Sequence, residues 1–221
     1  MVSFNIEAKN GVILDTFGNY NPENNGCTFS DELVSGTYVE CFNTTGDHYT
    51  LTGCKNVNIG AADNFTIETW VRINSMPYCL PMIFCTGNNG QGILSGNWSG
   101  RNDGVYVDFY GIGGAIIVSY DTNLIDKKFH DICVTKSGIT ITLYVDGKKI
   151  STGEAKSNMT WPNLLIGWDG LAYDRHADIT VAQLSVLDEC KYTGDYTPAL
   201  GRAANYFKAA KDSNDYLRWY K

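Results

Sequence analysis

Residues 129–151 read FHDICVTKSGITITLYVDGKKIS, and this stretch decides the fold. Apolar and polar residues alternate along it in two runs, and Ser137-Gly138 and Asp146-Gly147 mark two short turns. Alternation with a period of two is typical of half-buried β-strands, and Asp-Gly favours the two-residue turn of a β-hairpin. The stretch therefore predicts three antiparallel strands with one buried and one solvated face.

The same turns predict the register of the three strands. Two-residue loops at 137–138 and 146–147 set apolar residues opposite each other: Val134 with Ile141, Ile132 with Leu143, and Leu143 with Ile150. A slip of one residue would divide the apolar residues between two faces, so the alternation and the turns support one register.

The composition narrows the range of partners. A chain of 221 residues suits one large β domain, and 17 Lys and Arg against 24 Asp and Glu give a net charge of −7. Without a basic cluster, neither nucleic acid nor an anionic membrane is an expected partner. No apolar run reaches the roughly 18 residues of a membrane span, and the first residues lack the pattern of a signal peptide.

The cysteines and histidines do not have the spacing of a metal site. Seven cysteines without a CxxC pair, and three well-separated histidines, argue against zinc. Two interpretations stay open: seven reduced thiols in a protein made in a cytoplasm, or a bridge between Cys79 and Cys85.

Strand patterns recur along the chain. They are predicted near 2–10, in both halves of 36–51, and at 65–73, 82–85, 105–110, 115–120 and 179–187, whereas the turn-rich stretch 15–26 is expected to be a loop. In the strand 65–73, Trp70 lies on the face opposite the apolar residues, between Glu68 and Arg72. Burial under another segment is the favoured interpretation for this ring, and an exposed platform is the alternative.

Five segments in order resemble the laminin G-like jelly roll of the concanavalin A-like lectin/glucanase superfamily, in the form found in phage virion and bacterial surface proteins. They read GTYVECFNTTGDHYTL (36–51), DNFTIETWVRI (63–73), KKFHDICVTKSGITITLYVDGKKISTG (127–153), NLLIGWDG (163–170) and ADITVAQLSVLDECKYTGDYTP (177–198). Phe129 departs from the pattern, since relatives usually carry Trp there. The resemblance implies an all-β, two-sheet antiparallel jelly-roll sandwich over residues 1–198. A short C-terminal helix and tail are expected at 199–221.

A sugar site is predicted in the middle of the sandwich. Sugar sites combine aromatic rings for C–H faces with carboxylates for hydroxyls. The candidates share one strand face or the preceding loop: Trp98, Arg101, Asp103, Tyr106, Asp108 and Tyr110. A second sheet face covered by other segments would explain the same strand pattern.

Calcium is the one cofactor for which the sequence offers candidate ligands. The expected ligands are Asp15, with backbone oxygens of its loop, and Asp178, because the resemblance implies that these two regions meet at one edge. A simple solvated loop is the alternative, since Asp15 is the only Asp in it.

The C-terminal segment 199–221 combines a helical apolar stripe with an aromatic tail. It either caps the sandwich or contacts another subunit, through Leu200, Phe207, Tyr216, Leu217, Trp219 and Tyr220.

Catalysis is not expected. Glucanases of the superfamily place carboxylates two or four residues apart on one strand, and neither Glu68 nor Asp108 has such a partner. The sequence thus predicts a non-enzymatic binding or structural protein. Its expected place is the surface of a phage virion (as a decoration, fibre or tail protein) after synthesis in the host cytoplasm, with other virion proteins or itself as partners and host glycan for attachment. The alternatives are a secreted carbohydrate-binding module or lectin, outside the cell or on its surface, and then a glycoside hydrolase.

Overall fold

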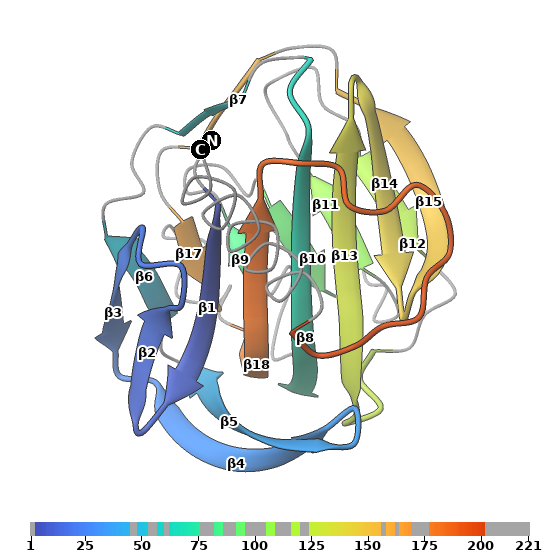
Figure 1. Cartoon of the computed structure of the whole chain (residues 1–221). Coiled ribbons are helices and arrows are strands. Elements are labelled where there is room, and N and C mark those ends of the chain that lie inside the picture. The colour runs from blue at the N-terminus through green and yellow to red at the C-terminus, as the bar shows by residue number, and fades with distance from the viewer. Residues whose placement is uncertain are drawn as a thin grey trace, which may run out of the picture.

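The larger of two stacked antiparallel sheets contains residues 129–151 (Figure 1). Its strand order is β15 (Lys148–Glu154), β14 (Thr140–Val145), β13 (Phe129–Ser137), β8 (Phe65–Ser75), β18 (Asp178–Leu187), β1 (Phe4–Lys9) and β2 (Val12–Asp15). Two more strands extend it, since β5 (Thr37–Thr44) pairs with β18, and β4 (Thr28–Val34) pairs with β5.

The second sheet lies behind the first in Figure 1. Its order is β12 (Ile116–Ser119), β11 (Val105–Asp108), β10 (Gly92–Ser95), β9 (Met82–Cys85), β17 (Leu164–Ile166), β6 (His48–Thr52) and β3 (Asn21–Asn25). A separate pair is formed by β7 (Val57–Ile59) and β16 (Met159–Trp161).

These elements come from a computed structural model, which describes residues 3–44, 48–52, 57–59, 62–75, 82–85, 92–95, 105–108, 116–119, 124–155, 158–161, 164–168 and 177–201. Within these ranges no helix has the length and hydrophobicity needed to cross a membrane.

The core lies between the two sheets. Alternate residues of β8 and β13, such as Ile67 and Val134, meet Phe84, Val107 and others from the second sheet, and all are fully buried. The predicted all-β sandwich is therefore confirmed. The C-terminal helix and tail were predicted at 199–221, and residues 202–221 of this range lie outside the described residues.

The predicted pairing of β13 with β14 is wrong by two residues. Ser137 pairs with Thr140, so Gly138 and Ile139 form the loop and Val134 faces Leu143. Gly138 has a φ of 56°, a left-handed conformation that glycine adopts without a Cβ clash, so the turn centres on it. A shift of two residues preserves the faces, which explains why Ile132, Val134, Ile141 and Leu143 are buried as expected.

The predicted pairing of Leu143 with Ile150 is also wrong. The register between β14 and β15 shifts after Leu143, so that Leu143 faces Ser151 while Tyr144 faces Lys149. Ile150 is the extra residue of this β-bulge, and it is exposed.

The second face of the three-stranded unit is solvated, as predicted, on β15, where Lys149 and Thr152 are exposed, but it is covered on β13 and β14. The segment 188–199, which we call the strap, crosses β8, β13 and β14 over this face (Figure 1). The rings of Tyr192 and Tyr196 stack with centroids 3.8 Å apart and cover Cys133 and Tyr144, which are buried. Two hydrogen bonds fix its end: the N–H of Tyr196 donates to the carbonyl of Gly147 at 2.8 Å, and the N–H of Lys149 donates to the Asp195 carboxylate at 2.9 Å.

The stretch 15–26 is only partly the loop that was predicted. Its second half forms β3, which pairs with β6 at the edge of the second sheet. Pro22 has no N–H to donate, which an edge strand tolerates, so its presence does not prevent the pairing.

His130 at the start of β13 makes the stability pH-dependent. Its ring nitrogens contact the carboxylates of Asp146 at 2.8 Å and Asp126 at 3.0 Å. The hydrogen bond with Asp146 contributes most to raising the pKa of His130 above its ordinary value of 6.5, and burial partly opposes this. The stabilisation is therefore fully present below that ordinary value and is lost as the pH rises through the raised pKa.

We expect urea unfolding midpoints of the wild type to fall as the pH rises above 6.5, the ordinary pKa of His130. The fall should be smaller in His130→Gln. Equal pH profiles for the two proteins would contradict the assignment.

Candidate functional site

Two strands of the larger sheet, β5 and β1, share one edge of β18, so the sheet divides there into two branches, and we call this point the fork. β5 pairs with the first part of this edge, ending at Val181, and β1 pairs with the later part, beginning at Gln183. Ala182 lies between them, where the register of β18 against β8 also shifts. A strand cannot be shared by two neighbours at one point, so a gap between β1 and β5 follows from the pairing.

Arg72 holds the β4–β5 ribbon beside this fork. Its guanidinium donates to both carboxylate oxygens of Glu32 on β4 at 2.8 Å and lies 5.0 Å from the ring centroid of Phe129. A two-point ion pair fixes orientation as well as distance, so the position of β5 is well defined.

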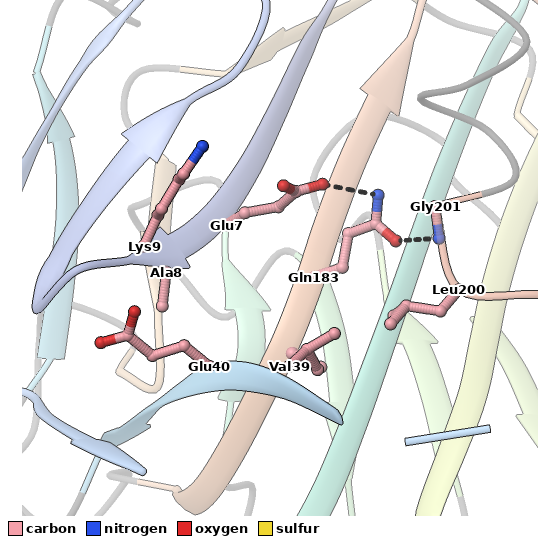
Figure 2. A pocket seen from close by; sticks show the side chains of 9 residues that line it. Glu7, Ala8, Lys9, Val39, Glu40, Gln183, Leu200 and Gly201 are labelled. Carbon is pink, nitrogen blue, oxygen red and sulfur yellow. Dashed lines mark hydrogen bonds between the residues drawn. The ribbon is translucent and has the colours of Figure 1, made fainter. Parts of the chain in front are cut away.

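A pocket of about 350 Å³ opens at the fork (Figure 2). Its lining comes from three strands and the end of the described chain: Glu7, Ala8 and Lys9 of β1, Val39 and Glu40 of β5, Ala182 and Gln183 of β18, and Leu200 and Gly201. We call this the fork pocket. Its volume is within the range of small-ligand sites in proteins.

One wall of the fork pocket is apolar. Val39, Ala182 and Leu200 pack together with Trp70, which is 7% exposed. The covered position predicted for Trp70 is thus confirmed. Its indole N–H is buried and has no acceptor among the described residues.

The rest of the lining, which we call the polar wall, carries polar side chains that differ in how many hydrogen bonds they already make. The amide of Gln183 accepts from the N–H of Gly201 at 2.7 Å and donates to the side chain of Asn5 at 2.7 Å. Glu7 accepts from Asn5 and Gln183, both through the same oxygen. Gln183 is therefore a fixed structural wall, whereas Glu7 retains a second oxygen.

Glu40 and Lys9 complete the polar wall. One oxygen of Glu40 accepts the N–H of Gly11 at 2.7 Å, and this bond ties β5 to the turn after β1. Within the described part of the chain, the second oxygen of Glu40 and the ammonium of Lys9 have no partner. The fork pocket thus combines an apolar wall with two available carboxylate oxygens and one available cation.

The predicted sugar-site residues are not tested. Tyr106 and Asp108 lie in β11 on either side of Val107, which is buried in the core. Their side chains, together with Trp98, Arg101, Asp103 and Tyr110, lie outside the described residues.

The two predicted calcium ligands are not brought together. Both oxygens of Asp15 accept two backbone amides each, at 2.8–3.0 Å, from Asn5 and from its own loop. Asp178 instead accepts from Asn74 and Ser75 at the far end of β18. The register sets Asp15 level with Leu184, six residues from Asp178, which is about 20 Å along a strand. Among the described residues no group of three or more metal-ligating side chains occurs.

Calcium binding stays a prediction that a melting experiment can decide. If an ion binds the native state, excess calcium must raise the thermal midpoint above that in chelator. The geometry of Asp15 and Asp178 leads us to expect no shift through this pair. A calcium-dependent shift that Asp178→Ala abolishes would contradict this expectation.

Of the predicted partner contacts, only Leu200 is described, and it packs against its own domain beside Val39. Phe207, Tyr216, Leu217, Trp219 and Tyr220 lie outside the described residues, so their role in subunit contacts stays a prediction.

Sequence reasoning missed a pair of buried carboxylates beneath the strap. Glu68 and Asp131 lie on neighbouring strands, and each accepts from a strap tyrosine: Tyr192 at 3.1 Å and Tyr196 at 2.5 Å. Desolvation by burial raises the pKa of both tyrosines, so they stay protonated and donate. The search for acids along a single strand could not find a pair that is formed across two strands.

The fork pocket was also missed. Its lining is spread from Glu7 to Gly201, and no local pattern marks it. One weak signal is Gln183, a long polar side chain in a closing strand that is otherwise mostly apolar or small.

Comparisons with solved structures agree on the fold. The binding domain of Paraclostridial Mosquitocidal Protein 1 superposes with a TM-score of 0.65 at 15% identity, covering 86% of this chain and 49% of that one. A botulinum neurotoxin type C structure, described as dependent for cell entry on two ganglioside molecules, gives 0.60 at 12%, covering 86% and 48%. The chain thus spans about half the length of these toxin domains.

A third structure matches over most of both chains. Domain 4 of AbnA, an extracellular arabinanase from Geobacillus stearothermophilus, was solved in complex with arabinotriose. It has a TM-score of 0.55 and 10% identity, covering 80% of this chain and 86% of that domain. No curated protein matches the chain.

The laminin G-type family described as concanavalin A-like lectin/glucanases superfamily matches residues 43–191. This range includes β6, β8, β13 to β15 and β18, the strands on which the sandwich is built. The chain belongs to the concanavalin A-like lectin/glucanase superfamily.

Proposed function

We propose that this protein is a non-catalytic carbohydrate-binding domain that takes its ligand in the fork pocket. The observation that carries the proposal is the composition of that pocket, which combines an apolar wall with available carboxylate oxygens and a lysine. A sugar presents both a C–H surface, which can pack on the apolar wall, and hydroxyl groups, which can hydrogen-bond to the carboxylates and the lysine.

The fold neighbours support the ligand class. One of them is described with gangliosides and another with arabinotriose, and both are matched by fold alone. We do not propose catalysis, because the carboxylate pair Glu68–Asp131 is buried beneath the strap, where a substrate has no access.

We further propose the surface of a phage virion as the setting, with other virion proteins or a second copy as partners. The four cysteines that the structure describes as free, at 27, 41, 133 and 190, support assembly in a reducing cytoplasm. A secreted carbohydrate-binding module is the alternative. Capsid and tail genes beside the gene of this protein would support the virion setting, and a neighbourhood of polysaccharide-degrading enzymes would contradict it.

The test of the binding function uses the full chain on a glycan array, followed by calorimetry with each bound glycan. We expect Lys9→Met to weaken binding about tenfold, because it removes the available cation of the pocket. Lys149→Met is the matched control, since Lys149 is exposed on β15 at the far edge of the sheet.

Two outcomes would contradict the proposal. The first is the absence of any bound glycan. The second is the release of reducing ends from a bound oligosaccharide, which would show catalysis.

A further inference from the structure

The fork pocket offers a ligand more acceptors than donors. The available groups are one oxygen each on Glu7 and Glu40 and the ammonium of Lys9. Ionised carboxylates only accept hydrogen bonds, so whatever meets Glu7 and Glu40 must donate. Hydroxyl groups meet this requirement, whereas carboxylate and sulfate groups do not.

The charge of the pocket leads to the same conclusion. Two carboxylates and one lysine leave a local charge of −1, within a chain of −7. An acidic group placed there would be attracted by Lys9 but repelled from two sides, and its desolvation would not be offset. An uncharged hydroxyl-rich ligand has no such cost.

The remaining surfaces decide how such a ligand would lie. The side chain of Gln183 is already hydrogen-bonded to Gly201 and Asn5, so it forms part of the pocket wall without hydrogen-bonding the ligand. Val39, Ala182 and Leu200 form the apolar wall, on which the C–H face of a sugar ring can pack. A ligand in the gap between β1 and β5 then has Glu7 and Lys9 of β1 on one side and Glu40 of β5 on the other (Figure 2). Its hydroxyls can donate to the two carboxylates, and Lys9 can donate to a ring or hydroxyl oxygen.

We infer that the fork pocket selects an uncharged sugar residue and rejects sialylated, uronic and sulfated ones. This inference rests on the proposed carbohydrate-binding function and makes it narrower. A preference for uncharged sugars would distinguish this protein from the toxin structure described with gangliosides, although the two share a fold.

The experiment uses an array of matched glycan pairs that differ by one terminal sialic acid, uronic acid or sulfate. We expect binding to the uncharged member of each pair only, with little change on raising the salt concentration. Glu40→Gln should weaken this binding about tenfold, because a neutral amide is a poorer acceptor for hydroxyls. Glu23→Gln is the matched control, since Glu23 is exposed on β3 of the other sheet.

The other outcomes are distinguishable. Preference for the acidic member, lost in Lys9→Met, would overturn the inference while leaving carbohydrate binding intact. Binding of uncharged glycans that is equal in wild type and Glu40→Gln, with equal thermal midpoints, would overturn the assignment to this pocket. No binding to either member would overturn both the inference and the proposed function.

Discussion

Gly147→Ala is expected to destabilise the protein by about 4 kcal/mol, the largest effect among the substitutions considered. A Cβ at this position would lie 2.0 Å from the backbone carbonyl oxygen of Tyr196 and 2.8 Å from a ring carbon of Pro198. Both belong to the strap, and Gly147 also has a φ of 75°. The alanine variant therefore combines backbone strain with displacement of the strap from Glu68 and Asp131.

Urea unfolding of the full chain measures this loss, and Gly138→Ala is the control. Gly138 also has a positive φ, but its added Cβ would meet nothing within 4 Å. It should cost only the backbone strain, about 1 kcal/mol. Equal losses for the two variants would show that the strap does not depend on close contact with Gly147.

Asp15→Ala is expected to cost about 3 kcal/mol, because it removes the acceptor of four backbone amides. One of these amides belongs to Asn5, whose side chain also supports the polar wall through Gln183. Asp15→Asn retains one acceptor oxygen and should cost about half as much. A variant within about 0.5 kcal/mol of the wild type would contradict this structural role.

The sequence was most informative where one strand face is buried. Alternation located β8, β13, β14 and β18, because a half-buried strand must repeat its apolar residues with a period of two. The buried and outer faces of the strands were predicted correctly even where the register was wrong, since a shift of two residues leaves each side chain on the same face.

Alternation was least informative where tertiary contacts decide whether a segment forms a strand or is covered. β4 and β3 were not predicted, and β3 reads NPENN, a sequence typical of a loop that becomes a strand only because β6 offers an edge. The bulge at Ile150 and the cover over Trp70 depend likewise on segments distant in sequence.

The candidate site could not be located from the sequence for the same reason. The fork pocket joins β1, β5 and β18, and the fork itself depends on which residues of β18 each neighbour takes. The predicted sugar-site residues form one continuous stretch, which local patterns can find, whereas residues gathered from three strands leave no such pattern.

The position of β18 has a consequence for folding during synthesis on the ribosome. β18 lies between β8 and the pair β1 and β5, and its partners include Phe4, which is 182 residues earlier than Val186. Until Leu187 has left the exit tunnel, β1 and β5 have no partner on that side, and β8 has one free edge. Contacts so distant in sequence slow folding, and unpaired edges invite association between nascent chains. The strand that divides its edge between two neighbours is therefore also the strand whose late synthesis sets how long the edges of β1, β5 and β8 stay unpaired.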